Sequence, residues 1–358
     1  MISVIKETNH ANWDQELGMT GGSIFLSREW LISVQDTRKK PLYLSFQRDG
    51  KKLGMIAGLE RPVKGTDYSQ LFFYSGMVLD NPSSELLSEC KSALLEYAKN
   101  NGFARIIIKS YDYNRAVLSF HKGFKTFQRG EYYIDLNKPI HEIESGFSKN
   151  ARRLLKKTRA DGLIFQKGQS GELLEKLFSL LNSTHEIRYS KGYGNYEIFS
   201  IPFLTKPVLL KLLQSGMGTL FYIESGGEII SMQFTIMSGK RGYGMLMGTT
   251  EQGYAANAPT LLWYEVILFL KEKGMKSFNL GGLPLGKKNA GLDRFKRSLG
   301  AVPLMSPEEF TDFLIRPLSG LNLFLAAKRK ILKYKLPWKL KKMIVDIPDV
   351  FIKGRDEY

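Results

Sequence analysis

The chain has 358 residues, of which 43% are hydrophobic and 24% charged. This composition is typical of a folded globular protein with about two domains, and it excludes a small scaffold held together by disulfides. Cys90 is the only cysteine, so neither an internal disulfide nor a cysteine-based zinc site can form. The longest apolar run, residues 261–270, is too short to span a bilayer, and the first ten residues lack a secretory signal pattern. We therefore expect a cytoplasmic protein.

Most of the net charge of +17 lies in two short segments. Residues 149–159 carry six basic side chains without an acid, and residues 316–342 carry nine. Such clusters indicate local contacts with phosphates or acidic lipid heads rather than a uniformly basic surface that coats nucleic acid. A non-catalytic protein that binds anions or nucleic acid is nevertheless an alternative, because the charge alone would account for it.

The first half of the chain begins with a predicted hairpin and continues with a strand, a helix and a further strand. The hairpin comprises residues 42–46 and 53–59, and the later elements are 71–79, 82–100 and 103–109. Pro82 stands at the start of the helix and Gly102 just after its end, which are the positions that these residues favour.

The same order of elements recurs about 176 positions later, followed by a basic tail. The second copy comprises strands 220–223, 229–237 and 241–248, a helix at 259–273 and a strand at 277–280. A strand at 132–136 and a basic helix at 147–160 connect the halves. Each half therefore has an α+β pattern of an antiparallel sheet with a crossing helix.

The repeat divides the chain into domains at 1–140 and 141–306, followed by a basic amphipathic tail at 307–358. Apolar residues at helical spacing lie beside the lysines of this tail, for example Leu321, Phe324 and Leu325. Residues 316–342 are expected to associate with an anionic membrane. Alternatively, the apolar stripe packs back onto the second domain and the lysines face water.

An ordered motif near the end of the second half resembles that of a known family. It comprises Asn279-Leu280-Gly281-Gly282, Gly291-Leu292, Phe295-Lys296 and Gly300. This arrangement resembles the C-terminal signature of the FemAB-like branch of the GNAT acyltransferase superfamily. The resemblance implies tandem GNAT-like (acyl-CoA N-acyltransferase) domains with mixed, mostly antiparallel sheets flanked by helices, the first domain a degenerate copy and the second catalytic.

The resemblance implies transfer of an acyl group from a thioester, acyl-CoA or an acyl carrier, to an amine of a small or lipid-linked cell-envelope or polysaccharide precursor. The alternative is an aminoacyl-tRNA-dependent transferase that adds amino acids to a lipid-linked peptidoglycan precursor. The chain lacks the usual Arg/Gln-x-x-Gly-x-Gly/Ala run before Pro259, and it lacks the coiled-coil arm of some tRNA-using members. Either donor, acyl-CoA or aminoacyl-tRNA, would be a co-substrate, and no bound cofactor is expected. A peripheral location on the inner face of the membrane is a further expectation.

Within this resemblance, Lys296 and Asn279 are the candidate catalytic residues, with Lys296 stabilising negative charge on the reacting carbonyl. The donor is expected at the helix that begins at Pro259, since helix N-termini bind anions. The candidate donor-binding residues are Asn257, as N-cap, and Thr260, Gly248 and Thr249.

A loop predicted at residues 185–196 supplies the candidate acceptor site. Its polar and aromatic side chains are Arg188, Tyr189, Lys191, Tyr193 and Tyr196, placed beside a cleft between the halves. The general base stays open among His185, Glu186, Glu251 and Asp293. No metal site is expected, because the four histidines are scattered without ligand spacing.

Overall fold

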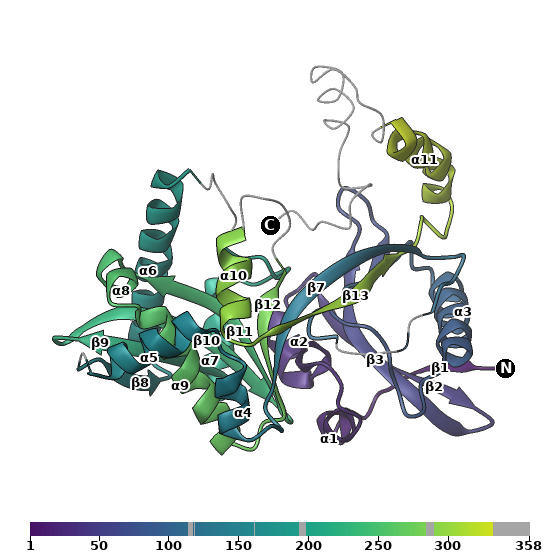
Figure 1. Ribbon diagram of the computed structural model, residues 1–358. Helices are drawn as coiled ribbons and strands as arrows, with labels where there is room; N and C mark the ends of the chain where they lie inside the picture. Colours follow the sequence, from purple (N-terminus) through teal and green to yellow (C-terminus); the bar gives the residue numbers. More distant parts are fainter. Residues whose placement is uncertain (114–116, 118, 161, 193–197, 284–289, 332–358) are drawn as a thin grey trace. The chain divides into compact units, whose positions relative to one another are not determined.

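The computed structural model describes residues 1–113, 117, 119–160, 162–192, 198–283 and 290–331 (Figure 1). The chain forms two compact units, and neither is continuous in sequence. The first unit comprises Met1–Ala11, Val34–Gln128 and the chain from Pro307 onward. The second unit comprises Asn12–Ser33 and Arg129–Ser306.

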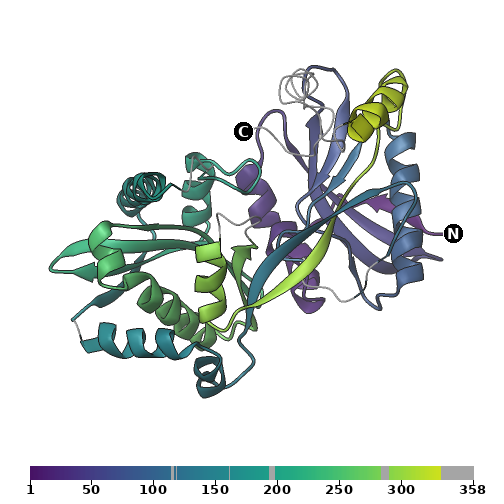
Figure 2. The same ribbon diagram turned by 45° about the horizontal axis from the view of Figure 1, so that its top comes forward.

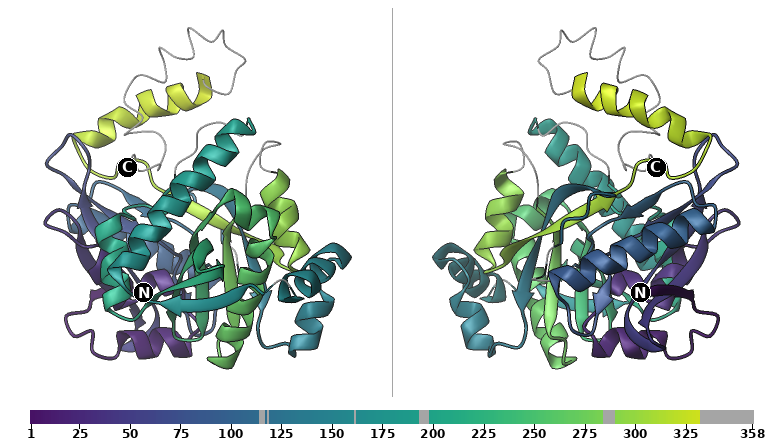
Figure 3. Two further views of the ribbon diagram at one scale, coloured as in Figure 1. Left: turned by 90° about the vertical axis from the view of Figure 1, so that its left-hand side faces the viewer. Right: turned by 90° about the vertical axis from the view of Figure 1, so that its right-hand side faces the viewer.

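The first unit contains a mostly antiparallel sheet with one long helix. Its strands lie in the order β1 (Ser3–Lys6), β2 (Lys40–Arg48), β3 (Lys51–Pro62), β4 (Ser69–Phe73), β6 (Ile106–Ile108) and the end of β13 (Val302–Phe310). Strands β4 and β6 pair in parallel, and the other strand pairs in this order are antiparallel among the described residues. Helix α3 (Ser84–Asn100) crosses the strands (Figure 3, right). The Ser83 hydroxyl caps it by accepting from the Leu86 N–H. The predicted hairpin and helix are thus confirmed.

The single strand predicted at 71–79 is wrong, because β4 ends at Phe73 and β5 (Val78–Leu79) pairs separately with β3. The ring of Tyr113 lies over the intervening Gly76, where a Cβ would stand 2.7 Å from the ring. The segment between β4 and β5 therefore leaves the sheet where Tyr113 packs against Gly76.

The start of the basic tail packs onto the first unit. Helix η3 (Leu318–Leu321) leads into α11 (Asn322–Ile331), and Leu318 and Leu325 join a cluster that contains Val63 and Ala104. The expectation that this stripe packs onto the second domain is therefore wrong, at least for these two leucines. Leu321, Leu323 and Phe324 are exposed. Leu332 and the lysines beyond it lie outside the described residues.

The second unit contains a sheet in the order β7 (Lys125–Asp135), β12 (Ser277–Gly282), β11 (Arg241–Thr249), β10 (Glu228–Ser238), β9 (Gly218–Ser225) and β8 (Ile164–Gly168). Strands β11 and β12 pair in parallel, whereas the other pairs among the described residues of this sheet are antiparallel. Its helices are α1 (Trp13–Met19), η1 (Ile24–Leu26), α2 (Arg28–Val34), α4 (Ile140–Ser145), α5 (Lys149–Ala160), α6 (Gly171–Ser190), α7 (Lys206–Gln214), α8 (Glu251–Ala255), α9 (Ala258–Glu272) and α10 (Ala290–Ser298). Helices α5 and α6 lie on opposite sides of these strands (Figures 2 and 3).

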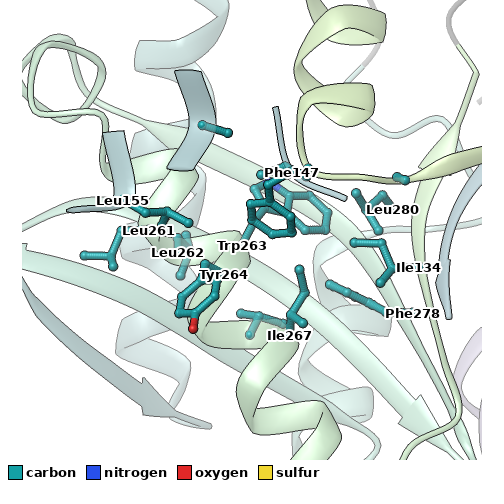
Figure 4. Packing of buried hydrophobic residues seen from close by; sticks show 14 of the residues in the cluster. Ile134, Phe147, Leu155, Leu261, Leu262, Trp263, Tyr264, Ile267, Phe278 and Leu280 are labelled. Atoms are coloured by element: carbon teal, nitrogen blue, oxygen red, sulfur yellow. The ribbon is translucent and has the colours of Figure 1, made fainter. Parts of the chain in front are cut away.

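The core of the second unit fixes α9 against the sheet. Leu262, Trp263 and Ile267 of α9 pack with Phe278 of β12 and Leu155 of α5, and all are buried (Figure 4). Nearly every residue of α9 up to Leu270 is buried, which explains its apolar sequence. This packing holds the first turn of α9 in a fixed place.

Helix α6 is longer than predicted, so the expected loop at 185–196 is partly wrong. The helix continues to Ser190 because no glycine or proline interrupts it before Gly192, which has φ +78°. His185, Arg188 and Tyr189 are therefore helical. In the part of the chain that the structure describes, no helix is long and apolar enough to cross a membrane.

Candidate active site

Strands β11 and β12 diverge at the place where the candidate catalytic residues lie. They pair at Arg241–Ser277, Gly242–Phe278 and Tyr243–Asn279. Beyond these pairs β11 shifts register against β10, and β12 shifts register against β7 between Asn279 and Gly282. Gly281 has φ +77°, a conformation that other residues rarely adopt. Strand β12 is therefore irregular between Asn279 and Gly282.

A buried carboxylate, Glu131 of β7, organises this region. Its oxygens accept hydrogen bonds from four side chains: Arg129 (2.8 Å), Tyr133 (3.1 Å), Tyr243 (2.8 Å) and Asn279 (2.7 Å). Glu131 is 3% exposed, so this network ties β7, β11 and β12 together out of contact with water.

Lys296 of α10 is buried beside this network. Its ammonium donates to the Gly282 carbonyl oxygen over 2.9 Å and lies 5.5 Å from the centre of the Tyr132 ring. Burial lowers the pKa of Lys296 to about 7, although the nearby charge of Glu131 acts in the opposite direction. At neutral pH this side chain is therefore present in both charged and neutral forms.

Asp293, on the same helix, is held in a separate set of contacts. It accepts a short hydrogen bond from the Tyr132 hydroxyl and two from Arg297 at 3.1 Å. The bond from Tyr132 is the main reason that the pKa of Asp293 lies below its usual range. Of the four candidate bases, Asp293 is thus poorly suited to accept a proton at neutral pH.

A cavity of about 430 Å³ lies in the second unit, and Phe295, the neighbour of Lys296 in sequence, is among its lining residues. Its apolar wall includes Leu154, Ile187, Met247, Leu292 and Phe295, and its polar groups include Arg188, Lys191, Thr249, Asn257 and Thr260. Cationic groups and the first turn of α9 therefore line the same largely apolar space, which is a combination suited to an amphipathic anion.

The predicted donor residues have distinct surroundings. Asn257 and Thr260 line the cavity at the start of α9. Asn257 occupies the N-cap position in a left-handed conformation, but its side chain donates weakly to the Ala255 carbonyl, so the predicted side-chain cap is wrong. Thr249 also lines the cavity, and its backbone N–H and C=O both bond the hydroxyl of Thr184. Gly248 makes room for α6, because a Cβ there would lie 2.6 Å from Leu180.

The predicted acceptor residues do not form one group. Arg188 and Lys191 line the same cavity as the donor residues, and the Lys191 ammonium lies 6.0 Å from the centre of the Tyr254 ring. Tyr189 is 63% exposed, and Tyr193 and Tyr196 lie outside the described residues. The structure thus brings together two sets of residues that the sequence assigned to different substrates.

Sequence reasoning missed Glu131 and three of its four hydrogen-bond partners, Arg129, Tyr133 and Tyr243, whereas Asn279 was already a candidate. The available signal was an acid followed directly by an apolar run, Glu131-Tyr132-Tyr133-Ile134. An acid at such a position is buried only when it is well bonded, which indicates a polar centre. Among the described residues, no group of three or more His, Cys, Asp or Glu side chains could hold a metal ion.

Comparisons with known proteins bear on the fold and on residues 145–297. Residues 145–297 match the family model described as Acetyltransferase (GNAT) domain. No curated protein sequence matches the chain. A crystal structure of FemX is 15% identical with a TM-score of 0.67, and the match covers 90% of this chain and 99% of that one.

Two further solved structures are similar to the chain. L-PGS from Bacillus licheniformis is 17% identical with a TM-score of 0.50, covering 92% of this chain and 98% of that one. A conserved protein of unknown function from Bacteroides thetaiotaomicron is 12% identical with a TM-score of 0.54, covering 87% and 99%. At these identities the likeness shows the fold alone, which is α+β and similar to that of FemX.

Proposed function

We propose that this protein, whose residues 145–297 match the model of a GNAT acetyltransferase domain, transfers an acyl group from a thioester directly to an amine. The observation that carries the proposal is the cavity of the second unit, where an apolar wall, two cationic side chains and the start of α9 meet. A thioester donor has the matching parts, because it joins an acyl chain to a phosphate-bearing arm.

The cavity supports a defined orientation of the donor. The acyl chain would lie against Met247, Leu292 and Phe295, where burial of apolar surface stabilises it. The phosphate would lie toward Arg188 and Lys191 and the positive end of the α9 dipole. GNAT domains typically use acyl-CoA, and an acyl carrier would present the same thioester chemistry.

In the reaction, a neutral amine attacks the thioester carbon and forms the C–N bond. The carbonyl oxygen becomes negatively charged, and collapse of this intermediate breaks the C–S bond. The thiolate leaves, and the proton lost by the amine nitrogen ends on it, so that the products are an amide and a free thiol. In its charged form Lys296 would donate a hydrogen bond to the oxyanion from a site that excludes water. Glu131 and Asn279 would act as positioning residues, because their network fixes the backbone around Gly281.

The acceptor in this proposal is the amine of a cell-envelope or polysaccharide precursor. This part rests on the motif at 279–300, which resembles that of the FemAB-like branch. The same resemblance makes aminoacyl-tRNA a second donor to test.

The experiment presents the purified full chain with four donors: acetyl-CoA, a longer acyl-CoA, an acyl carrier protein bearing the same acyl group, and aminoacyl-tRNA. Nucleotide-linked amino sugars serve as acceptors, and the products are identified by mass spectrometry. We expect a new amide with a thioester donor, and a loss of about 10²-fold in turnover for Lys296→Ala, as for removal of one oxyanion donor. Amide formation from aminoacyl-tRNA alone would replace the thioester proposal, and no product with any donor would contradict transferase activity toward these acceptors.

A further inference from the structure

Helix α5 presents a cationic face that the proposed reaction does not use. Lys149, Arg152, Arg153, Lys156 and Lys157 are all exposed and follow the spacing of one helix face, and α5 contains no acid. The opposite face, with Ala151, Leu155 and Thr158, is buried.

These charges are not explained by ion pairing. Lys149, Arg152, Lys156 and Lys157 form no ion pair with an acid among the described residues, and Arg153 donates to Asn150 over 3.0 Å. Arg159 differs, because its guanidinium lies 4.6 Å from the centre of the Tyr264 ring. Like charges three and four residues apart destabilise a helix, so the stability of α5 does not account for this face.

The same helix forms part of the donor cavity. Leu154 lines the cavity, and in helical projection it lies between the cationic face and the buried face. The cavity volume of about 430 Å³ is near the lower end of the range for ligand pockets. A donor with a bulky carrier would therefore leave that carrier outside, beside α5.

We propose that the cationic face of α5 docks an acidic acyl carrier protein whose phosphate-linked arm delivers the acyl thioester into the cavity. This inference rests on the proposed function and names the source of its donor. An acidic helix on the carrier would complement the cations of α5, while the phosphate of the arm would meet Arg188 and Lys191.

Two other polyanions fit the face less well. Single-stranded RNA is bound through aromatic side chains on which bases stack, and α5 contains no aromatic residue. A membrane-binding helix inserts apolar side chains, and the exposed positions of α5 are charged or polar. A folded acidic protein requires only the charge that α5 supplies.

The test compares the full chain with the double variant Arg152→Glu/Lys156→Glu. A matched control, Lys211→Glu/Lys240→Glu, makes the same charge change at exposed sites elsewhere in the second unit. A milder variant, Arg152→Ala/Lys156→Ala, covers the case in which the charge reversal disturbs folding, and circular dichroism checks each protein.

Binding of a carrier protein with its arm but no acyl group is measured first, by calorimetry at low salt. We expect the charge reversal to weaken binding by about tenfold or more and the control to leave it unchanged. With acylated carrier, kcat/KM should fall by a similar factor, while the rate with acyl-CoA stays within about twofold of wild type.

The binding measurement does not depend on turnover, so the proposed function and the docking proposal can fail separately. Absence of turnover with every thioester would contradict the proposed function, whereas loss of carrier binding in the charge reversal would still support docking. Equal carrier binding by wild type and the charge reversal, or no carrier binding by wild type, would overturn the inference. It would also be overturned if tRNA or anionic vesicles, and not the carrier, bound in an α5-dependent manner.

Discussion

The Asn279 carboxamide donates from Nδ2 to Glu131 Oε2 over 2.7 Å, and its Oδ1 accepts from the Gly281 N–H over 2.8 Å. One buried side chain thus connects β12 to β7 and holds the irregular end of β12 at Gly281. The two contacts need one donor and one acceptor on the same side chain. Alanine has neither, and an ionised aspartate has no donor.

We expect Asn279→Ala to lower the free energy of unfolding by about 1–3 kcal/mol, because it leaves buried groups of Glu131 and Gly281 without this partner. Asn279→Asp should destabilise more, since it places a second carboxylate against Glu131. Urea denaturation measures both changes. Asn150→Ala, at an exposed site on α5, should stay within about 0.5 kcal/mol of wild type, and an equal loss at both asparagines would contradict this role.

The repeated elements could be predicted from sequence because they depend on local patterns. The hairpins at 40–62 and 218–238 follow alternation and glycine-containing turns, and α3 and α9 follow proline and glycine at their ends. The assignment of Asn12–Ser33 to the second unit could not be predicted, since it depends on long-range contacts such as that of Phe25 with Tyr243.

The candidate site was predictable only in part. The motif identified Lys296 and Asn279 as candidates, but the four side chains that converge on Glu131 come from three strands. That convergence depends on the register in which β7, β12 and β11 pair, and spacing along the chain does not reveal this register. Arg188 and Thr260 line one cavity although α6 and α9 are distant in sequence, so their proximity depends on tertiary packing.

Gly248 and Gly18 should respond in opposite ways to substitution by alanine. A Cβ at Gly248 would lie 2.6 Å from Leu180, so Gly248→Ala should force α6 away from β11 and destabilise the protein by about 1–3 kcal/mol. Nothing lies within 4 Å of a Cβ at Gly18 in α1, and alanine there should stabilise by roughly 0.5–1 kcal/mol. Thermal denaturation compares the two variants, and a stable Gly248→Ala would show that α6 adjusts easily.

Arg188 and its neighbour Tyr189 should differ in their effect on the donor. Arg188 lines the cavity, whereas Tyr189 is exposed and is not among the cavity residues. We expect Arg188→Ala to raise the KM for a thioester donor by about tenfold, as for loss of a hydrogen bond to a charged group, and Tyr189→Ala to leave it unchanged. Steady-state kinetics with acyl-CoA provide the measurement. Equal KM values for the two variants would remove Arg188 from the donor site.

The pH dependence of stability should report the burial of Lys296. Its pKa is lowered to about 7 in the folded protein, mainly by burial, whereas an unfolded lysine titrates near 10.4. Between these values the unfolded chain binds a proton that the folded chain lacks, so stability rises with pH across this interval. Below about pH 7 both states hold the proton, and the lysine destabilises the fold by its full amount.

We therefore expect wild type to gain stability relative to Lys296→Met between pH 7 and about pH 10, with no relative change from pH 5.5 to 6.5. Methionine has a similar length and no charge, so it keeps most of the packing while removing the titration. Urea denaturation of both proteins across this range gives the difference. Lys149→Met serves as the control, because Lys149 is exposed and its substitution should give parallel pH profiles. If Lys296→Met also runs parallel to wild type, then Lys296 is charged in the folded protein throughout, and its ammonium is more strongly stabilised by Glu131 and the Gly282 carbonyl than burial alone allows.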